Sequence, residues 1–182
     1  MKALISLVIF VFLSYLTKGQ ENTGKFQKLN SIQLELSGRE EFLIPFSLHY
    51  ERIIAQNAAI AWTIKAGGTY QPIGSSIQKA AILESGIMGQ GEKHHWEVGL
   101  TGMLQDKKRS TMPGEAFSGK ATSWYSAVRI GYRYQAADSR WIVRIGGLIP
   151  VAYDAENVDW SKSYKLRNVL FPWPAISIGR SF

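Results

Sequence analysis

The sequence predicts an all-β protein, an eight-stranded antiparallel up-and-down transmembrane β-barrel. Three observations predict this fold. Apolar and polar residues alternate with a period of two along eight segments, which is the pattern of strands with two different faces. Short connections between these segments alternate with mostly longer ones. After the first 19 residues, no segment shows a comparably long helical period.

The first element, residues 1–19, is typical of a secretory signal peptide. A short positive start precedes an apolar run over residues 3–16, and small or polar residues follow up to Gly19. The run is shorter than the roughly 20 apolar residues that span a bilayer. We therefore expect cleavage near Gly19 and a single barrel domain over residues 20–182. An uncleaved membrane anchor is the alternative.

Eight strands are expected in the rest of the chain, each marked by apolar residues at alternate positions. Their expected bounds are Ser31 to Ser37, Phe42 to Ile53, Ala58 to Gly68, Gln78 to Met88, His95 to Gln105, Ser123 to Gln135, Arg140 to Val151 and Phe171 to Phe182. The alternating apolar residues are, in order, Ile32, Leu34, Leu36; Ile44, Phe46, Leu48, Tyr50; Ile60, Trp62, Ile64; Leu83, Ile87; Trp96, Val98, Leu100; Val128, Ile130, Tyr132, Tyr134; Trp141, Val143, Ile145, Ile149; and Ile176, Ile178, Phe182.

The connections predict how the strands are joined. The segments IAQNA, GQGEKH and AADS are hairpin-sized and rich in turn residues. The other four, GREE, TYQPIGSSI, DKKRSTMPGEAFSGKAT and YDAENVDWSKSYKLRN, are mostly longer. Short turns at one rim and longer loops at the other are typical of an outer-membrane barrel whose two termini lie on the short-turn, periplasmic side.

The polar face of the strands carries a balanced set of charges. Four acidic and four basic residues lie in mid-strand on this face: Glu35, Glu51, Lys65, Glu84, Glu97, Arg129, Arg133 and Arg144. Such a balance suits an enclosed lumen, where charges must be paired and hydrogen-bonded. We expect these residues to form a lumen charge network. The alternative is that they cover the water-exposed outer face of a soluble barrel.

Aromatic residues mark the two ends of the strands. We expect a set of them to lie at the two membrane interfaces, where amphipathic rings are favoured: Tyr50, Trp96, Trp124, Tyr132, Tyr134, Trp141, Trp173 and Phe182. The core of a soluble protein would scatter them. Trp62 falls in the middle of the apolar band and does not fit this arrangement.

These features together resemble the small outer-membrane β-barrel proteins of Gram-negative bacteria, of the OmpA or OmpX transmembrane-domain type. The resemblance rests on the signal peptide, the eight strands, the alternating connections and a last strand that ends in Phe182. It implies a location in the bacterial outer membrane, among its lipids and lipopolysaccharide. It also implies recognition of the last strand by the barrel-assembly machinery. Arg180 departs from the pattern, because such strands usually carry an apolar or aromatic residue there; near the interface its side chain can reach the headgroups.

The amino-acid composition limits which other partners and cofactors the protein can be expected to bind. The chain has 182 residues, a net charge of +7, three histidines and no cysteine. The lack of cysteine excludes a disulfide framework and a thiolate metal site. The basic excess is spread along the chain, unlike the clustered charge of a nucleic-acid-binding protein. We expect no nucleic-acid partner, no metal site and no cofactor, and we expect a monomer.

Two segments carry candidate chemistry. Ser47, His49 and Glu51 share one strand face, but residues two apart differ by nearly 7 Å of rise, whereas a catalytic triad needs hydrogen bonds of about 3 Å. We therefore expect luminal hydrogen bonding and no catalysis. The basic run at the third outer loop is a candidate contact for lipopolysaccharide phosphates. It consists of Lys107, Lys108, Arg109 and Lys120.

The function that the sequence favours is that of a small outer-membrane barrel with a side-chain-filled lumen, which is not a diffusion pore. Its role would be structural or one of recognition, through extracellular loops around residues 69–76, 106–122 and 154–168. One alternative is a secreted or periplasmic lipocalin-like carrier of an apolar ligand. The other is an outer-membrane lipid-modifying enzyme, such as a lipid A-modifying hydrolase.

Overall fold

The structure is a computed structural model that describes residues 26–38, 44–73, 76–109, 120–136, 139–154 and 172–182. The expected signal peptide and its cleavage site near Gly19 lie outside these residues. No helix in the described part of the chain is long and apolar enough to cross a membrane.

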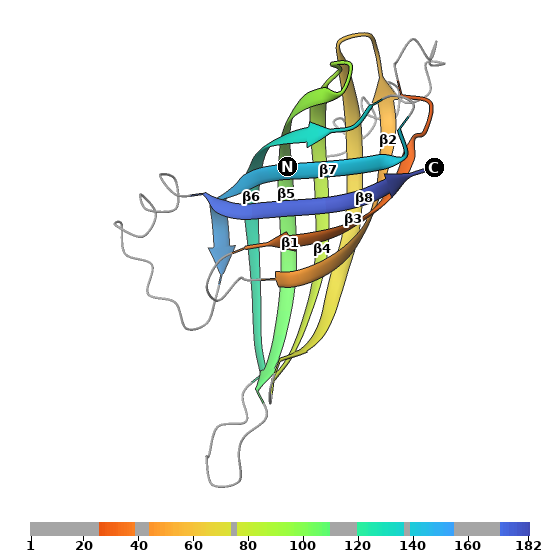
Figure 1. Ribbon diagram of the computed structural model, residues 1–182. Helices are drawn as coiled ribbons and strands as arrows, with labels where there is room; N and C mark the ends of the chain where they lie inside the picture. The colour runs from red at the N-terminus through yellow and green to blue at the C-terminus, as the bar shows by residue number, and fades with distance from the viewer. Residues whose placement is uncertain (1–25, 39–43, 74–75, 110–119, 137–138, 155–171) are drawn as a thin grey trace, which may run out of the picture.

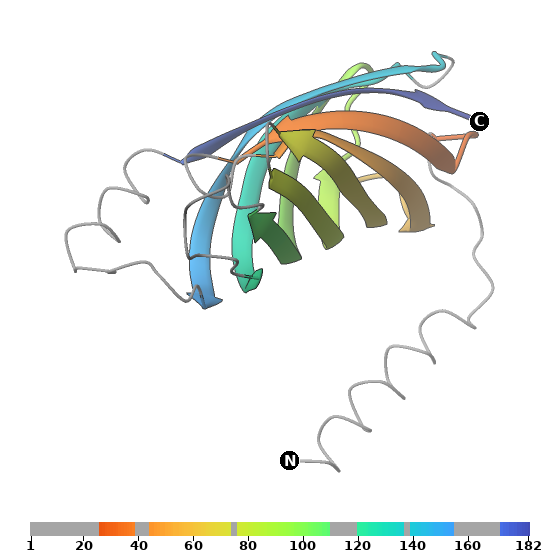
Figure 2. The same cartoon turned by 90° about the horizontal axis from the view of Figure 1, so that it is seen from below.

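Eight antiparallel strands form one closed barrel, which confirms the predicted fold class. Each strand pairs with the next one along the chain, and the last strand pairs with the first (Figure 1). The strands are β1 (Asn30–Ser37), β2 (Ile44–Gln56), β3 (Ile60–Ile73), β4 (Ser76–Gly89), β5 (His94–Arg109), β6 (Lys120–Tyr134), β7 (Trp141–Asp154) and β8 (Trp173–Ser181). Figure 2 shows them following one another round the barrel, with the blue β8 beside the orange β1.

The pairing of β8 with β1 closes the sheet. Their register runs from Ser31 opposite Ser181 to Ser37 opposite Ala175. Beyond the strand end, the backbone N–H of Phe182 donates to the carbonyl oxygen of Asn30 at 2.8 Å. Within the closed part of the barrel, every described strand is therefore paired on both sides, so that no edge of unpaired backbone groups faces outward.

Strands β3 to β6 are each longer than the sequence predicted. Strands β3 to β6 continue well beyond the other four at one end of the barrel (Figure 1). Most of the expected loop 69–76 is therefore strand, with Gln71 opposite Gln78 and only residues 74–75 between β3 and β4. The prediction stopped too early because it followed apolar alternation, whereas backbone pairing continues after that alternation has ended.

The extension of β3 and β4 changes the expected difference in loop length between the two rims of the barrel. The connections at one rim are 57–59, 90–93 and 135–140, all of them short. At the other rim, residues 110–119 connect β5 to β6 and residues 155–172 connect β7 to β8, but the connection 74–75 is the shortest of all. Long connections are thus confined to two of the hairpins on that side.

Paired glycines lie on the inner face where neighbouring strands come close together. Gly86 is opposite Gly99, and Gly131 is opposite Gly146. A Cβ atom on Gly146 would lie 2.7 Å from the carbonyl oxygen of Ile130 and 3.0 Å from the Cα atom of Gly131. Glycine at this position therefore permits a close approach of two backbones beside the long arginine side chains of the lumen.

Candidate functional site

All eight predicted lumen charges point into the barrel. Each of these side chains belongs to a residue that is at most 5% exposed. They come from β1 to β7, so that residues far apart in the sequence meet in the middle of the lumen. The sequence placed them on the correct face because successive side chains of a strand alternate between its two sides.

One half of the network is built around Lys65 and Arg129. The Lys65 Nζ atom lies 2.9 Å from Glu35 Oε2 and 3.0 Å from Glu84 Oε2. Arg129 contacts the same two acids, with its Nη2 atom 2.7 Å from Glu35 Oε1 and its Nε atom 2.7 Å from Glu84 Oε2. Each of the two carboxylates therefore joins a lysine to an arginine.

The other half is built around Arg133 and Arg144. Arg133 donates from Nε to Glu97 Oε1 at 2.5 Å and from Nη2 to Glu51 Oε2 at 2.7 Å. Arg144 donates from Nε to Glu97 Oε2 at 2.7 Å. Its Nη2 atom donates to Glu84 Oε1 at 3.0 Å, and this bond links the two halves of the network.

Neutral side chains complete the hydrogen bonding. The Thr101 hydroxyl donates to Glu84 Oε2 at 2.9 Å, and Arg144 Nη1 donates to Gln33 Oε1 at 3.2 Å. Arg133 Nη1 also donates to Gln135 Oε1 at 3.1 Å. Buried charges are tolerated when they are both paired and hydrogen-bonded, and this network meets that condition.

Several of the ion pairs cross the lumen between strands that are not neighbours in the sheet. Arg129 on β6 reaches Glu35 on β1, and Arg133 on β6 reaches Glu51 on β2. Arg144 on β7 reaches Glu84 on β4. The network therefore connects opposite walls of the barrel through its interior.

An apolar layer lies on one side of the charge network, towards the connection between β7 and β8. It consists of Ile82, Met103, Tyr125, Ala127, Leu148, Trp173 and Ala175. The Tyr125 and Trp173 rings meet edge to face, with centroids 5.4 Å apart. This layer fills the lumen with large side chains.

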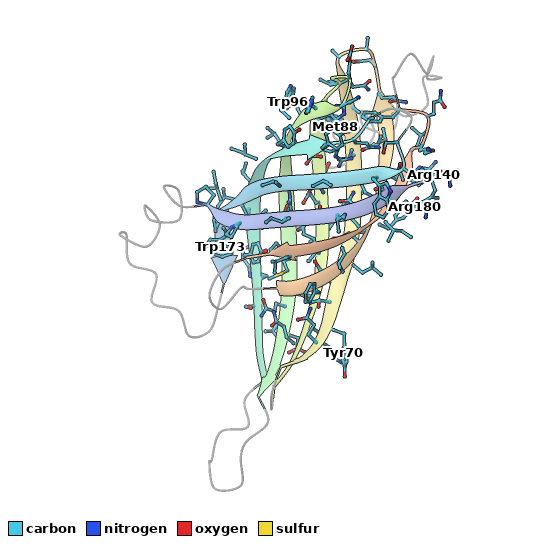
Figure 3. The ribbon with its side chains drawn as sticks, in the orientation of Figure 1. Tyr70, Met88, Trp96, Arg140, Trp173 and Arg180 are labelled. Atoms are coloured by element: carbon cyan, nitrogen blue, oxygen red, sulfur yellow. The ribbon has the colours of Figure 1, made fainter. Side chains whose placement is uncertain are left out.

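The position of Trp173 corrects a prediction. The sequence analysis placed this residue at the membrane interface, but it is 0% exposed and lies inside the barrel (Figure 3). Trp173 lies two and four positions before Ala175 and Ser177, so it shares their face of β8, and both of these residues face inward. The residue type suggested an interface, whereas the strand period places the ring in the lumen.

A second apolar layer lies at the opposite end of the lumen, towards the short connections. Phe26, which precedes β1, packs there with Ile53, Ala61 and Met88. Its ring centroid lies 5.1 Å from that of His95. The Gln56 side-chain amide accepts from the Phe26 backbone N–H at 3.2 Å and donates to the Phe26 carbonyl oxygen at 2.8 Å. The sequence analysis missed this contact because a single apolar residue outside a strand has no periodic signal.

Ser47 and His49 take part in luminal hydrogen bonding, as expected, but they bond directly to each other, which was not expected. The Ser47 Oγ atom lies 2.7 Å from His49 Nε2, so the argument from strand rise was wrong for these two side chains. The His49 side chain extends along the strand far enough to bring its ring within hydrogen-bond distance of the Ser47 hydroxyl. Both residues are 1% exposed and face the lumen, and the Glu51 carboxylate is engaged by Arg133. The pair is therefore an interior hydrogen bond without an acidic third member.

The two adjacent histidines lie on opposite faces, as their spacing requires. His95 is buried, whereas His94 is exposed and contacts the Tyr132 hydroxyl. Within the described ranges, no group of three or more metal-ligating side chains comes together.

The outer surface of the barrel is apolar. The exposed aliphatic and phenylalanine side chains on it include Ile32, Leu34, Leu36, Phe46, Leu48, Leu83, Val98, Leu100, Leu104, Ile130, Val143, Ile145, Ile176 and Ile178. In the pairing register they lie side by side, for example Leu48 beside Leu34 and Leu34 beside Ile178. A continuous apolar surface around buried ions is the reverse of the arrangement in a water-soluble protein.

Exposed aromatic side chains lie around this apolar surface. All of the predicted interface aromatics except Trp173 are exposed: Tyr50, Trp96, Trp124, Tyr132, Tyr134, Trp141 and Phe182. Trp96 is at the end of the barrel that also holds Met88, and Tyr70 is at the opposite end (Figure 3). Trp62 is exposed and is the third residue of β3, next to the connection 57–59. It therefore lies nearer the strand end than the sequence analysis placed it.

The predicted basic loop is partly strand. Lys107, Lys108 and Arg109 belong to the end of β5, and Lys120 begins β6 directly opposite Lys108. The structure describes the backbone of these residues but not their side chains. Their contact with lipopolysaccharide remains a prediction.

The chain was compared with protein families, curated proteins and solved structures. No protein-family model matches the chain, and no curated protein does. Among solved structures, the crystal structure of the N-terminal β-barrel domain of Pseudomonas aeruginosa OprF matches with a TM-score of 0.49 and 12% sequence identity. The match covers 86% of this chain and 100% of that domain. The chain is similar to that barrel. The similarity concerns the fold.

Proposed function

We propose that this protein is a small outer-membrane β-barrel with a closed lumen and a structural or recognition role. The observation that carries the proposal is the distribution of side chains, with paired charges inside and an apolar surface outside. An outward-facing apolar band bordered by aromatic residues is what a bilayer requires of a spanning barrel. The signal peptide expected over residues 1–19 supports export to that membrane.

The same distribution argues against the lipocalin-like alternative. A carrier of an apolar ligand needs an apolar cavity at mid-height in the barrel. Here that level is occupied by Glu84, Arg129 and Arg144, whose carboxylate and guanidinium groups bond to one another. The Ser47 and His49 pair gives little support to the enzyme alternative, because both side chains face this ionic interior and lipid would contact the outside.

Localisation and gel mobility test the proposal. The full chain, expressed with its leader in a Gram-negative host, is expected in the membrane pellet after carbonate washing. It should migrate differently on a gel before and after boiling, because a closed barrel resists unfolding by detergent at room temperature. N-terminal sequencing of the pelleted protein should begin near Gln20. Recovery of folded, soluble protein from the periplasm would contradict the proposal.

We further propose that the lumen does not conduct solutes. The apolar layer with Phe26, the charge network and the apolar layer with Trp173 follow one another along the interior. Side chains that fill the lumen in successive layers leave little room for a hydrated sugar. A recognition role would then use the connections at the rim that includes residues 110–119 and 155–172.

Solute flux into liposomes tests whether the lumen is closed to solutes. Liposomes that contain the refolded protein should take up a small sugar no faster than protein-free liposomes. Liposomes with an open porin at the same protein-to-lipid ratio provide the positive control. Uptake at a rate comparable with the porin would show that the layers open in the membrane.

A further inference from the structure

A basic pocket lies on the outer surface where β8 ends beside β1. It has a volume of about 510 Å³ and is lined by Lys28, Ile32, Arg140, Arg180, Ser181 and Phe182. Arg140, which directly precedes β7, and Arg180, near the end of β8, both line this pocket (Figure 3). We call this set of six residues the rim pocket.

Arg180 occupies an otherwise apolar part of the outer face. In the pairing register it lies between Ile32 on β1 and Trp141 on β7. Ile178 and Phe182, two positions before and after it on the same face, are both exposed. An exposed guanidinium at the edge of an apolar band is stabilised in a bilayer when it reaches an anion at headgroup level.

The backbone of the rim pocket is held in place on two sides. The Ser181 N–H donates to the carbonyl oxygen of Arg140 at 2.7 Å, and the Phe182 N–H donates to that of Asn30 at 2.8 Å. The Ser181 hydroxyl also donates to the Ser139 carbonyl oxygen at 3.2 Å. These bonds fix the strand end that carries Arg180 beside the residue that carries the second guanidinium.

The charge of the rim pocket is positive. Lys28, Arg140 and Arg180 contribute three cationic groups, and the other lining residues are Ile32, Ser181 and Phe182. Guanidinium groups bind phosphate oxygens through paired, charge-assisted hydrogen bonds.

We propose that the rim pocket binds the phosphate headgroup of an anionic phospholipid. Arg180 and Arg140 would hold the phosphate, with Lys28 adding positive charge. The acyl chains would lie along the exposed side chains of Ile32 and Ile178, which continue from the pocket into the apolar band. This inference rests on the proposed function, because it requires that the outer face of the barrel contacts a bilayer.

Lipid retention by the refolded full-length mature protein tests the inference. The protein in detergent micelles is incubated with equal amounts of phosphatidylglycerol and phosphatidylcholine, and bound lipids are counted by native mass spectrometry. The wild type should retain phosphatidylglycerol preferentially. Arg180→Gln should lower its relative affinity about fivefold, which corresponds to about 1 kcal/mol for one basic group at an anionic surface.

Arg52→Gln is the matched control. Arg52 is also an exposed arginine on the outer face near the same end, opposite Asn30 in the register, but it does not line the rim pocket. This variant should keep the wild-type preference. An equal loss in both variants would mean general attraction of anionic lipid to a basic rim, and would overturn the inference. Equal retention of the two lipids by the wild type would overturn it as well.

Two further measurements distinguish a lipid site from a site for free phosphate, and this inference from the proposed function. Inorganic phosphate, compared with sodium chloride at equal ionic strength, should not displace phosphatidylglycerol; displacement would identify a site for free phosphate. Each variant is also tested for heat-dependent gel mobility and for insertion into phosphatidylcholine vesicles. Failure of the wild type to insert would count against the proposed function, whereas insertion without lipid preference would overturn this inference alone.

Discussion

Arg144→Ala is expected to lower the free energy of unfolding of the barrel by about 3 to 5 kcal/mol, the range for breaking a buried ion pair from one side. Arg144 donates to both Glu84 and Glu97 in the middle of the lumen. Its removal leaves carboxylate oxygens that have lost their partner and remain out of contact with water. Urea titration of the protein refolded into lipid vesicles measures the change.

Arg52→Ala serves as the control for Arg144→Ala. Arg52 is exposed on the outside of β2, so the loss of its guanidinium should change stability by much less than 1 kcal/mol, as is usual for exposed charges. The double variant Arg144→Ala, Glu97→Gln should be more stable than the sum of the single effects predicts, because the two groups interact directly. Equal stability of the Arg144 and Arg52 variants would show that the network is in contact with water.

Trp173→Ala is expected to destabilise the barrel by about 3 to 5 kcal/mol, as do other truncations of large buried aromatic side chains. The indole is completely buried, and its partner Tyr125 would face the resulting cavity. Trp173→Phe should retain part of the lost stability, because a ring would still contact Tyr125. The same vesicle-based urea titration applies.

Trp124→Ala distinguishes a lumen residue from an interface residue. Trp124 is 44% exposed on the outer face of β6, so its truncation leaves no interior cavity. Its effect on stability should be clearly smaller than that of Trp173→Ala. If the two alanine variants were equally stable, Trp173 would be acting as an interface anchor, contrary to its position in the structure.

The strand pattern and the side on which each residue lies follow from local sequence. A strand presents alternate residues to opposite faces, so the parity of a position is enough to assign Glu35, Glu84 and Arg144 to one face. The same parity assigns Ile32 and Ile178 to the other face. All eight lumen charges could be named in advance for this reason. One predicted interface aromatic, Trp173, was placed wrongly. It was chosen because it is a tryptophan, although its position in the alternation of β8 assigns it to the inner face.

The strand lengths were only partly predictable. Apolar alternation ends where the apolar band ends, but β3 to β6 continue as paired strands beyond it. The backbone hydrogen bonds that define a ladder are independent of side-chain polarity. A sequence pattern based on hydrophobicity therefore locates the band and underestimates the strands that project from it.

The contacts across the lumen depend on the closed sheet. Arg129 meets Glu35 across 94 positions of sequence, and Phe26 reaches His95 through the end of the barrel. These distances are set by the register between every pair of neighbouring strands, including the bulges in β2 and between β6 and β7. A shift of one residue in any register would send the side chains of a strand to the other face. Periodicity thus indicates which charges are inside, whereas their partners follow from how eight strands close into one barrel, because pairing across the lumen is a property of the whole sheet.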